Sequence, residues 1–390
     1  MDFTLEFILH FIATMILSVV LTPLVKLLAF QVGAVDYPGK RRINQKVMPT
    51  IGGLAIFIAF AIGCIWQFHD YLFMKKVWAI LLGALIVVIT GFIDDRKELT
   101  PGQKSIGLLI AALEIYFVAD LKMDTISIPF VGMFHLGWLS LPVTIIWIFA
   151  ITNAVNLIDG LDGLASGVSM IALSTIGIVS YFYLPDNIGT YLTMLIFLLV
   201  AAILGFFPYN FHPATIFLGD TGALFLGFMI SVVSLHNLKN VTFISVVTPM
   251  FILGVPITDT VFAIIRRKFN KQPISSADKM HLHHRLLSLG FTHRGAVLTI
   301  YGLALTFSFI ALLMTYASTP AIILMIICTT IGLELFIELI GLVGENRQPL
   351  LNTLKFFGNS DYRHEYLLSR YEKKKNKKEQ INQNSKKPKS

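Results

Sequence analysis

The stretch LPVTIIWIFAITNAVNLIDGLDGLASG, from Leu141 to Gly167, decides the fold. Its first ten residues carry no charge, yet Asp159 and Asp162 follow within the next twelve, each with a glycine after it. An apolar run of this kind approaches the roughly 20 residues that a helix needs to cross a bilayer. The two acids therefore mark the point where we expect a membrane helix to end.

The rest of the chain has the same character. It contains 390 residues, of which 55% are hydrophobic and 14% charged, and its mean hydropathy is +0.73. Such values exclude an ordinary soluble protein. We predict an all-α polytopic membrane protein, with a membrane domain at 1–344 and a basic tail at 345–390 that is partly disordered. About eleven spans are predicted, at 5–30, 51–68, 77–93, 105–119, 141–158, 164–183, 189–207, 221–235, 241–265, 295–316 and 320–342.

The distribution of Lys and Arg predicts the orientation of these spans. Loops after odd-numbered spans, together with the tail, hold 26 of the 31 basic residues, whereas the other side holds 4 and Lys26 lies within the first span. Because cytoplasmic loops are enriched in Lys and Arg, the odd-numbered side is predicted to be cytoplasmic. The N-terminus is then outside and the C-terminus inside.

Two segments outside the spans have a distinct composition. The stretch between Asp120 and Ser140 contains β-branched residues interrupted by Gly and Pro, which favours a short hairpin on the outer surface. The tail carries KKKNKK at Lys373–Lys378, which is typical of a segment that lies on anionic lipid. Neither segment indicates nucleic-acid binding.

The acidic residues gather on the predicted cytoplasmic side. Asp94 and Asp95 end the third span in GFIDDRKE, Asp159 and Asp162 follow the fifth span, and Asp220 precedes the eighth in FLGDTG. Each position also has a structural explanation. The Asp94–Asp95 pair suits a solvated loop, the Asp159 and Asp162 pair suits a tight turn with glycines, and Asp220 suits a helix N-cap.

Basic and amide side chains fall on the same side of the membrane. The segment HLHHR follows the ninth span, NFHPATIFLGD brings Asn210 and His212 ahead of Asp220, and a basic cluster that includes Lys46 precedes the second span. HLHHR also suits an amphipathic loop helix with surface histidines. Carboxylates and cations on one face suit a divalent metal with a phosphorylated substrate, because Mg²⁺ takes oxygen ligands from carboxylates and phosphates. HLHH lacks the ligand spacing of a structural zinc site.

Four motifs in this order, DDRKE, NAVNLIDGLDGLASG, NFHPATIFLGDTGA and HLHHRLL, resemble those of the polyprenyl-phosphate N-acetylhexosamine-1-phosphate transferases. The resemblance implies a Mg²⁺-dependent membrane enzyme, with Mn²⁺ as a substitute, that moves a sugar-1-phosphate from a UDP-sugar to a polyprenyl phosphate and releases UMP. It also implies an active site in cytoplasmic loops, a bacterial cytoplasmic membrane location and a homodimer.

The resemblance assigns roles residue by residue. Asp94, Asp95 and Asp220 match the catalytic and metal-binding acids. The substrate-binding positions are Asn156, Asp159, Asp162 and Asn210 for the nucleotide, His281, His283, His284 and Arg285 for the diphosphate and sugar, and, less directly, Lys104 and Lys46.

Glu98 and the HLHHRLL segment separate this chain from the branch of the family that uses UDP-N-acetylmuramoyl-pentapeptide. They resemble instead the branch that transfers N-acetylglucosamine-1-phosphate from UDP-N-acetylglucosamine to undecaprenyl phosphate, and the basic tail favours a teichoic acid enzyme. Two alternatives stay open: the muramoyl-pentapeptide reaction and, in another class, an ion-coupled transporter. The transporter requires acids near mid-membrane, whereas most acids here cluster at one face; Glu114 in the fourth span and Glu334 and Glu338 in the last are exceptions.

Overall fold

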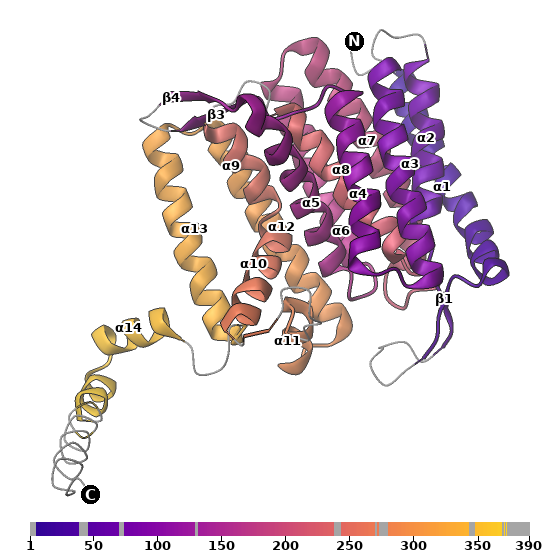
Figure 1. The fold of residues 1–390 in the computed structure, drawn as a ribbon. Helices are drawn as coiled ribbons and strands as arrows, with labels where there is room; N and C mark the ends of the chain where they lie inside the picture. The colour runs from indigo at the N-terminus through magenta and orange to yellow at the C-terminus, as the bar shows by residue number, and fades with distance from the viewer. Residues whose placement is uncertain are drawn as a thin grey trace, which may run out of the picture. The chain divides into compact units, whose positions relative to one another are not determined.

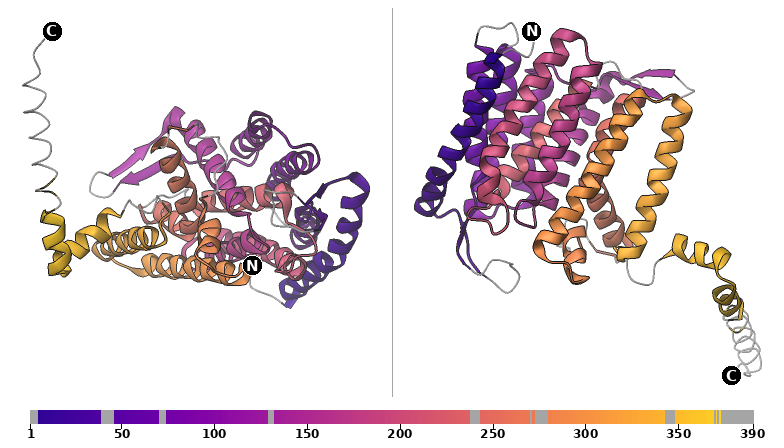
Figure 2. Two further views of the ribbon diagram at one scale, coloured as in Figure 1. Left: turned by 90° about the horizontal axis from the view of Figure 1, so that it is seen from below. Right: turned by 180° about the vertical axis from the view of Figure 1, so that it is seen from behind.

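The structure is a computed structural model, and it describes residues 5–38, 46–69, 74–128, 132–237, 243–269, 271–272, 280–342 and 348–368, with Arg370 and Glu372. Its contacts divide the chain into two compact units, Met1–Ile322 and Ile323–Ser390. The first unit is a bundle of helices (Figures 1 and 2). The predicted all-α class is therefore confirmed.

The helices that begin in the first unit are α1 (Leu5–Val32), α2 (Gly53–Phe68), α3 (Met74–Lys97), α4 (Pro101–Phe117), α5 (Ser140–Ile158), α6 (Leu164–Tyr183), α7 (Asp186–Asn210), α8 (Gly219–Asn237), α9 (Phe243–Ile252), α10 (Gly254–Phe269), α11 (Leu282–Ser288), α12 (His293–Tyr316) and α13 (Thr319–Ile340). A 3₁₀ turn, η1 (Gly137–Leu139), leads into α5. Two antiparallel pairs of strands accompany them: β1 (Val35–Asp36) with β2 (Met48–Pro49), and β3 (Thr125–Ile128) with β4 (Gly132–His135).

A helix covers the position of every predicted span. Within the described residues, seven helices are long and apolar enough to cross a bilayer, so the count of about eleven spans stays a prediction. The ninth span was predicted as one helix over 241–265 and is wrong in that respect, since it is divided into α9 and α10 after Ile252. Pro256 explains the break, because proline lacks an N–H and clashes with the carbonyl four residues earlier.

Helix α8 forms the centre of the first unit. Its side chains are buried from Thr221 to Leu235, and α3 and α5 pack against it. Two glycines allow close approach: a Cβ at Gly53 of α2 would lie 2.0 Å from the Cα of Gly222, and one at Gly91 of α3 would lie 2.5 Å from the Cα of Thr221. Small residues at helix interfaces are typical of membrane bundles. This packing fixes the start of α8 beside the end of α3.

The two ends of the first unit differ in composition. The end of α3, the starts of α4 and α8, and the α5–α6 connection lie at one end of the bundle, near α11, at the bottom of Figure 1. The β3–β4 hairpin lies at the opposite end, which confirms the hairpin predicted between Asp120 and Ser140. The acids of three motifs and the histidine helix of the fourth thus lie at one end, as the charge pattern predicts.

The second unit contains most of α13 and the short helix α14 (Pro349–Gly358). The Glu338 carboxylate accepts the Leu350 and Leu351 N–H groups at 2.8 and 2.6 Å, and therefore caps α14. Helix α14 occupies the start of the predicted basic tail. The basic cluster Lys373–Lys378 lies outside the described residues.

Candidate active site

The carboxylate of Asp95, near the end of α3, caps helix α8. One oxygen accepts the N–H of Asp220 at 2.9 Å, and the other accepts the N–H of Thr221 at 2.9 Å together with the Thr221 hydroxyl. The predicted N-cap role of Asp220 is therefore wrong, because α8 starts one residue earlier, at Gly219, and its cap comes from another helix. The Asp220 side chain is consequently available to other groups.

Lys104 joins two of the predicted acids. Its ammonium group contacts Asp94 Oδ2 and lies 3.3 Å from Asp220 Oδ1. The other oxygen of Asp94 accepts the Leu99 N–H at 2.7 Å. Lys104 stands in the first turn of α4, which begins with a capping box between Thr100 and Gln103. The sequence TPGQK thus sets the helix start that places this lysine between the two carboxylates.

The end of α5 brings two further polar side chains to Asp220. The Asn156 amide contacts Asp220 Oδ1. The Asp159 carboxylate makes no hydrogen bond or ion pair with any described residue. Burial, together with the neighbouring carboxylates of Asp220 and Asp162, raises the pKa of Asp159 to about 8. Asp159 is thus an acid close to other acids and without a partner among the residues that the structure describes.

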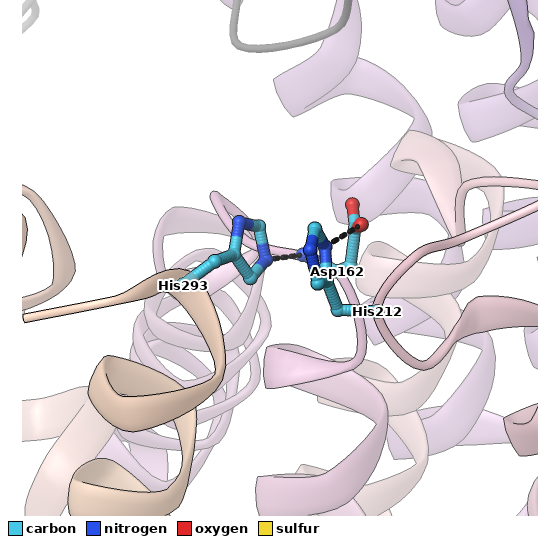
Figure 3. Close-up of side chains that lie close together, drawn as sticks. All are labelled: Asp162, His212 and His293. Atoms are coloured by element: carbon cyan, nitrogen blue, oxygen red, sulfur yellow. Dashed lines mark hydrogen bonds and ion pairs between the residues drawn. The ribbon is translucent and has the colours of Figure 1, made fainter.

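Asp162 belongs to a hydrogen-bonded cluster with two histidines (Figure 3). Its Oδ2 accepts from His212 Nδ1 at 2.8 Å and from the Ala214 N–H at 3.1 Å, while its own N–H donates to His293 Nε2 at 3.0 Å. The two histidine rings stack with centroids 4.1 Å apart and planes 18° from parallel. The cluster fastens the α5–α6 loop to the α7–α8 loop and to α12.

This cluster also has the composition of a metal site, since its three candidate ligand atoms lie within 4.8 Å of one another. Its geometry favours hydrogen bonding instead. The Asp162 N–H occupies the His293 Nε2 lone pair, and stacked rings do not point their nitrogens at a shared ion. We therefore interpret the cluster as a brace for the loops.

Helix α11 carries the histidines of HLHHR against the same loop. His281 and His283 are buried, so the alternative of surface histidines is wrong for these two, whereas the segment does form a short helix on which His284 is half-buried. A Cβ at Gly160 would lie 2.1 Å from His283 Nε2, which means that the ring occupies the space that a side chain would need. Burial, with His284 close by, lowers the pKa of His283 to about 3. His283 is therefore neutral near pH 7 and adds no positive charge for a phosphate.

The remaining predicted residues are placed less centrally. Asn210 is buried, and its amide accepts from Ser166 Oγ at 2.8 Å and donates to the Ile216 carbonyl at 3.2 Å, so it braces the ends of two helices. Lys46 is exposed just before β2, and Arg285 is half-buried on α11. The contacts link Asp94, Asp95, Lys104, Asn156 and Asp220 directly, whereas Asn210 bonds to Ser166 and Ile216 instead.

Three contributing residues were not among the predicted site residues. His212 and His293 hold Asp162, and Asp259 of α10 holds His281. The sequence does contain one indication for Asp259, because an ionisable residue within an apolar span is a functional candidate by default. His293 follows Thr292, which caps α12, and nothing in its spacing indicates its partner.

Comparison with known proteins adds an independent result. The family model described as glycosyl transferase family 4 matches residues 77–237, which include Asp94, Asp95, Asn156, Asp159, Asp162, Asn210 and Asp220.

The chain is also similar to individual members. It is 44% identical to a "probable undecaprenyl-phosphate N-acetylglucosaminyl 1-phosphate transferase" of Bacillus subtilis, over 90% of this chain and 97% of that protein. Identity to a decaprenyl-phosphate N-acetylglucosaminephosphotransferase of Mycobacterium tuberculosis is 34%, over 71% and 74% of the two chains. A phospho-N-acetylmuramoyl-pentapeptide-transferase of Halalkalibacterium halodurans is 31% identical, over 79% and 96%. The motifs, the helical membrane fold and these similarities together show that the chain belongs to glycosyl transferase family 4.

Proposed function

We propose that this protein transfers N-acetylglucosamine-1-phosphate from UDP-N-acetylglucosamine to undecaprenyl phosphate and releases UMP. The arrangement of Asp94, Lys104, Asp220 and Asn156 is the observation that carries the proposal. It forms a compact charged group at the ends of apolar helices, where a lipid phosphate and a soluble nucleotide can meet. The names of the relatives with 44% and 34% identity support the same sugar phosphate.

A divalent cation fits this group. Asp94, Asp159 and Asp220 bring three carboxyl groups together, and Lys104 is the one cation that pairs with them among the described residues. Carboxylates that lie close together repel one another, and a cation between them relieves the repulsion. Carboxylate and amide oxygens are also the ligands that Mg²⁺ prefers. We assign Mg²⁺, or Mn²⁺ in its place, to Asp220 with Asn156 and Asp159 nearby. When bound, the ion would neutralise the diphosphate and the departing UMP.

The chemical step requires that two anionic phosphates meet. A phosphate oxygen of the acceptor forms a bond to the β-phosphorus of the donor, and the bond from that phosphorus to the bridging oxygen breaks, with its electron pair leaving on UMP. Lys104 offsets negative charge beside Asp94 and Asp220, which favours approach and in-line positioning.

The two neighbouring acids of α3 have separate parts in this proposal. Asp94 is the group that accepts a proton from the acceptor phosphate, since only one of its oxygens is committed to a backbone N–H. Asp95 acts by positioning, because both of its oxygens accept hydrogen bonds from the start of α8. This replaces the metal-binding role that the resemblance alone gives to Asp95.

The nucleotide is assigned to the loop between α5 and α6. Within the described part of the chain the Asp159 carboxyl group has no partner there, while Asp162 is held by His212 and the Ala214 N–H. We therefore assign Asp159 to direct contact with the donor and Asp162 to the shape of the loop. The distribution of Lys and Arg supports a site that faces the cytoplasm, and the basic tail supports a role in wall teichoic acid synthesis.

The transporter alternative loses support from the positions of its acids. Glu338 caps α14 and is thereby accounted for by a structural role. Glu114 is buried beside Gly83, and neither of its oxygens has a partner among the described residues. With Glu338 accounted for, Glu114 and Glu334 remain of the three acids, and they are a weaker basis for an ion path than the connected charged group at the helix ends.

The test uses the purified full chain in detergent with Mg²⁺ and undecaprenyl phosphate. UDP-N-acetylglucosamine or UDP-N-acetylmuramoyl-pentapeptide is added in turn, and UMP release is measured together with the lipid product. We expect release with the first donor alone. Release with the pentapeptide donor alone would support the other branch, and release with neither would contradict both.

A further inference from the structure

A buried aspartate of α10 holds the start of the histidine helix α11. Asp259 is 1% exposed, and its Oδ2 lies 2.8 Å from His281 Nδ1, while its Oδ1 accepts the Leu282 N–H at 2.9 Å. Helix α11 has no cap of its own, since the side chain of its N-cap residue His281 makes no capping bond. One carboxylate thus fixes both the helix start and the ring of the preceding histidine.

We propose that Asp259 is a positioning residue for the transfer reaction and acts through His281. A carboxylate accepts a hydrogen bond from an N–H group at Nδ1, so it selects the tautomer of His281 that carries its hydrogen there. Nε2 is then an acceptor that can take a hydrogen bond from a sugar hydroxyl, and it can donate to a phosphate oxygen only when the ring is protonated. The inference rests on the proposed function, because it assigns a role within the same site.

The placement of α11 supports a role in the reaction. Two residues after His281, the His283 ring fills the space beside Gly160, within the loop assigned to the nucleotide. The rings of His281 and His283 lie parallel within 4° at a centroid separation of 6.0 Å. A shift at Asp259 therefore moves the histidines relative to Asp159. Displacements of about 1 Å in an active site cost roughly a hundredfold in rate.

A purely structural role is the competing explanation, and the two oxygens of Asp259 allow it to be tested. Asp259→Asn keeps an oxygen that can accept the Leu282 N–H, but it replaces the carboxylate at His281 Nδ1 with an N–H₂ donor. Asp259→Ala removes both contacts. If only the helix cap matters, Asp259→Asn retains activity and Asp259→Ala loses it. If the ring contact matters, Asp259→Asn already loses activity.

Four variants in the full chain make up the experiment: Asp259→Asn, Asp259→Ala, His281→Ala and the double variant Asp259→Asn with His281→Ala. UMP release is measured with UDP-N-acetylglucosamine and undecaprenyl phosphate. We expect Asp259→Asn to lower kcat by about 10- to 100-fold, by analogy with the range found for outer partners of metal-bound histidines. In the His281→Ala background, the same change should alter kcat less than about twofold, because residues that act as a unit are non-additive.

Thr260→Val is the matched control, since it alters the neighbouring position of α10, where the hydroxyl has no partner among the described residues. It should retain normal kcat. Equal losses from Asp259→Asn with and without His281 would overturn the proposal.

A readout that does not depend on activity separates this inference from the proposed function. Nitrogen-15 NMR of histidine-labelled protein reports which ring nitrogen carries the proton. We expect His281 to be protonated at Nδ1 in the unaltered chain and to change tautomer in Asp259→Asn. An unchanged tautomer would contradict the role of Asp259 even if UMP is released. Absence of UMP release with the expected tautomer change would contradict the proposed function alone.

Discussion

The Asp95 carboxylate accepts the backbone N–H of Asp220 at 2.9 Å, so one acid of the site positions another. The contact joins the end of α3 to the start of α8, which pack closely at Gly91. Acidic side chains are unfavourable near a helix C-terminus and favourable at an N-terminus. Asp95 thus occupies a poor position in its own helix and a good one for its neighbour.

Replacement of Asp95 should therefore lower stability. Asp95→Ala removes the cap of α8, and we expect the free energy of unfolding to fall by about 0.5–2 kcal/mol. Thermal unfolding in detergent measures the change. Asp159→Ala is the control, since it removes no hydrogen bond among the described residues and should not lower Tm. Equal losses of Tm in both variants would contradict the capping role.

Lys104 should be required for turnover because it pairs with Asp94 and Asp220. Lys104→Met leaves these carboxyl groups without their cation, and we expect kcat for UMP release to fall by at least about a hundredfold. Lys122→Met is a matched control. Lys122 also lies between two acids, at 3.1 Å from Asp120 and 4.0 Å from Asp124, but at the opposite end of the bundle. The Lys122→Met variant should keep a normal kcat, and a similar loss of kcat in both variants would argue against a specific role of Lys104.

Asp159 should make stability depend on pH. Burial raises its pKa from 3.8 to about 8. Between these values the folded chain keeps a proton that the unfolded chain has lost, so the free energy of unfolding falls as pH rises. Asp159→Asn removes this contribution and should reduce the decline in Tm between pH 5 and 8, a window chosen within those pKa values. An identical decline in the variant would contradict the shifted pKa.

Gly160 should tolerate no side chain. Gly160→Ala places a Cβ against the His283 ring, so the helix or the loop must move. We expect kcat/KM for UDP-N-acetylglucosamine to fall by more than about tenfold, consistent with the cost of misplacing site groups. Gly302→Ala is the control, because a Cβ at this helical position of α12 meets no atom within 4 Å. Normal kcat/KM in Gly160→Ala would show that α11 does not bear on the donor.

The parts of the fold that follow from local patterns could be predicted from sequence. Apolar runs marked the helices, and β-branched residues with Gly and Pro breaks marked the β3–β4 hairpin. The division of span nine at Ile252 had a local signal in Pro256 that the hydrophobic pattern concealed. Helix α14 was not predicted, since its cap, Glu338, lies more than ten residues earlier in the chain.

The site was predictable in its members and less so in their arrangement. Several different motifs on the same predicted side of the membrane identified Asp94, Asp159 and Asp220. Capping of α8 by Asp95, and of α11 by Asp259, depends on helices that meet only in three dimensions. No spacing rule in a single sequence specifies such contacts.

The most direct measurement of the central claim is UMP release by the purified chain and by its Asp220→Asn variant, with Mg²⁺, undecaprenyl phosphate and UDP-N-acetylglucosamine. We predict UMP and the N-acetylglucosamine-bearing diphospholipid in equal amounts from the unaltered chain. The variant should elute as a folded protein and lose at least about a hundredfold in kcat, because Asp220 meets Lys104 and Asn156 at the centre of the charged group. Equal turnover by the two proteins, or no product from the unaltered chain, would contradict the account.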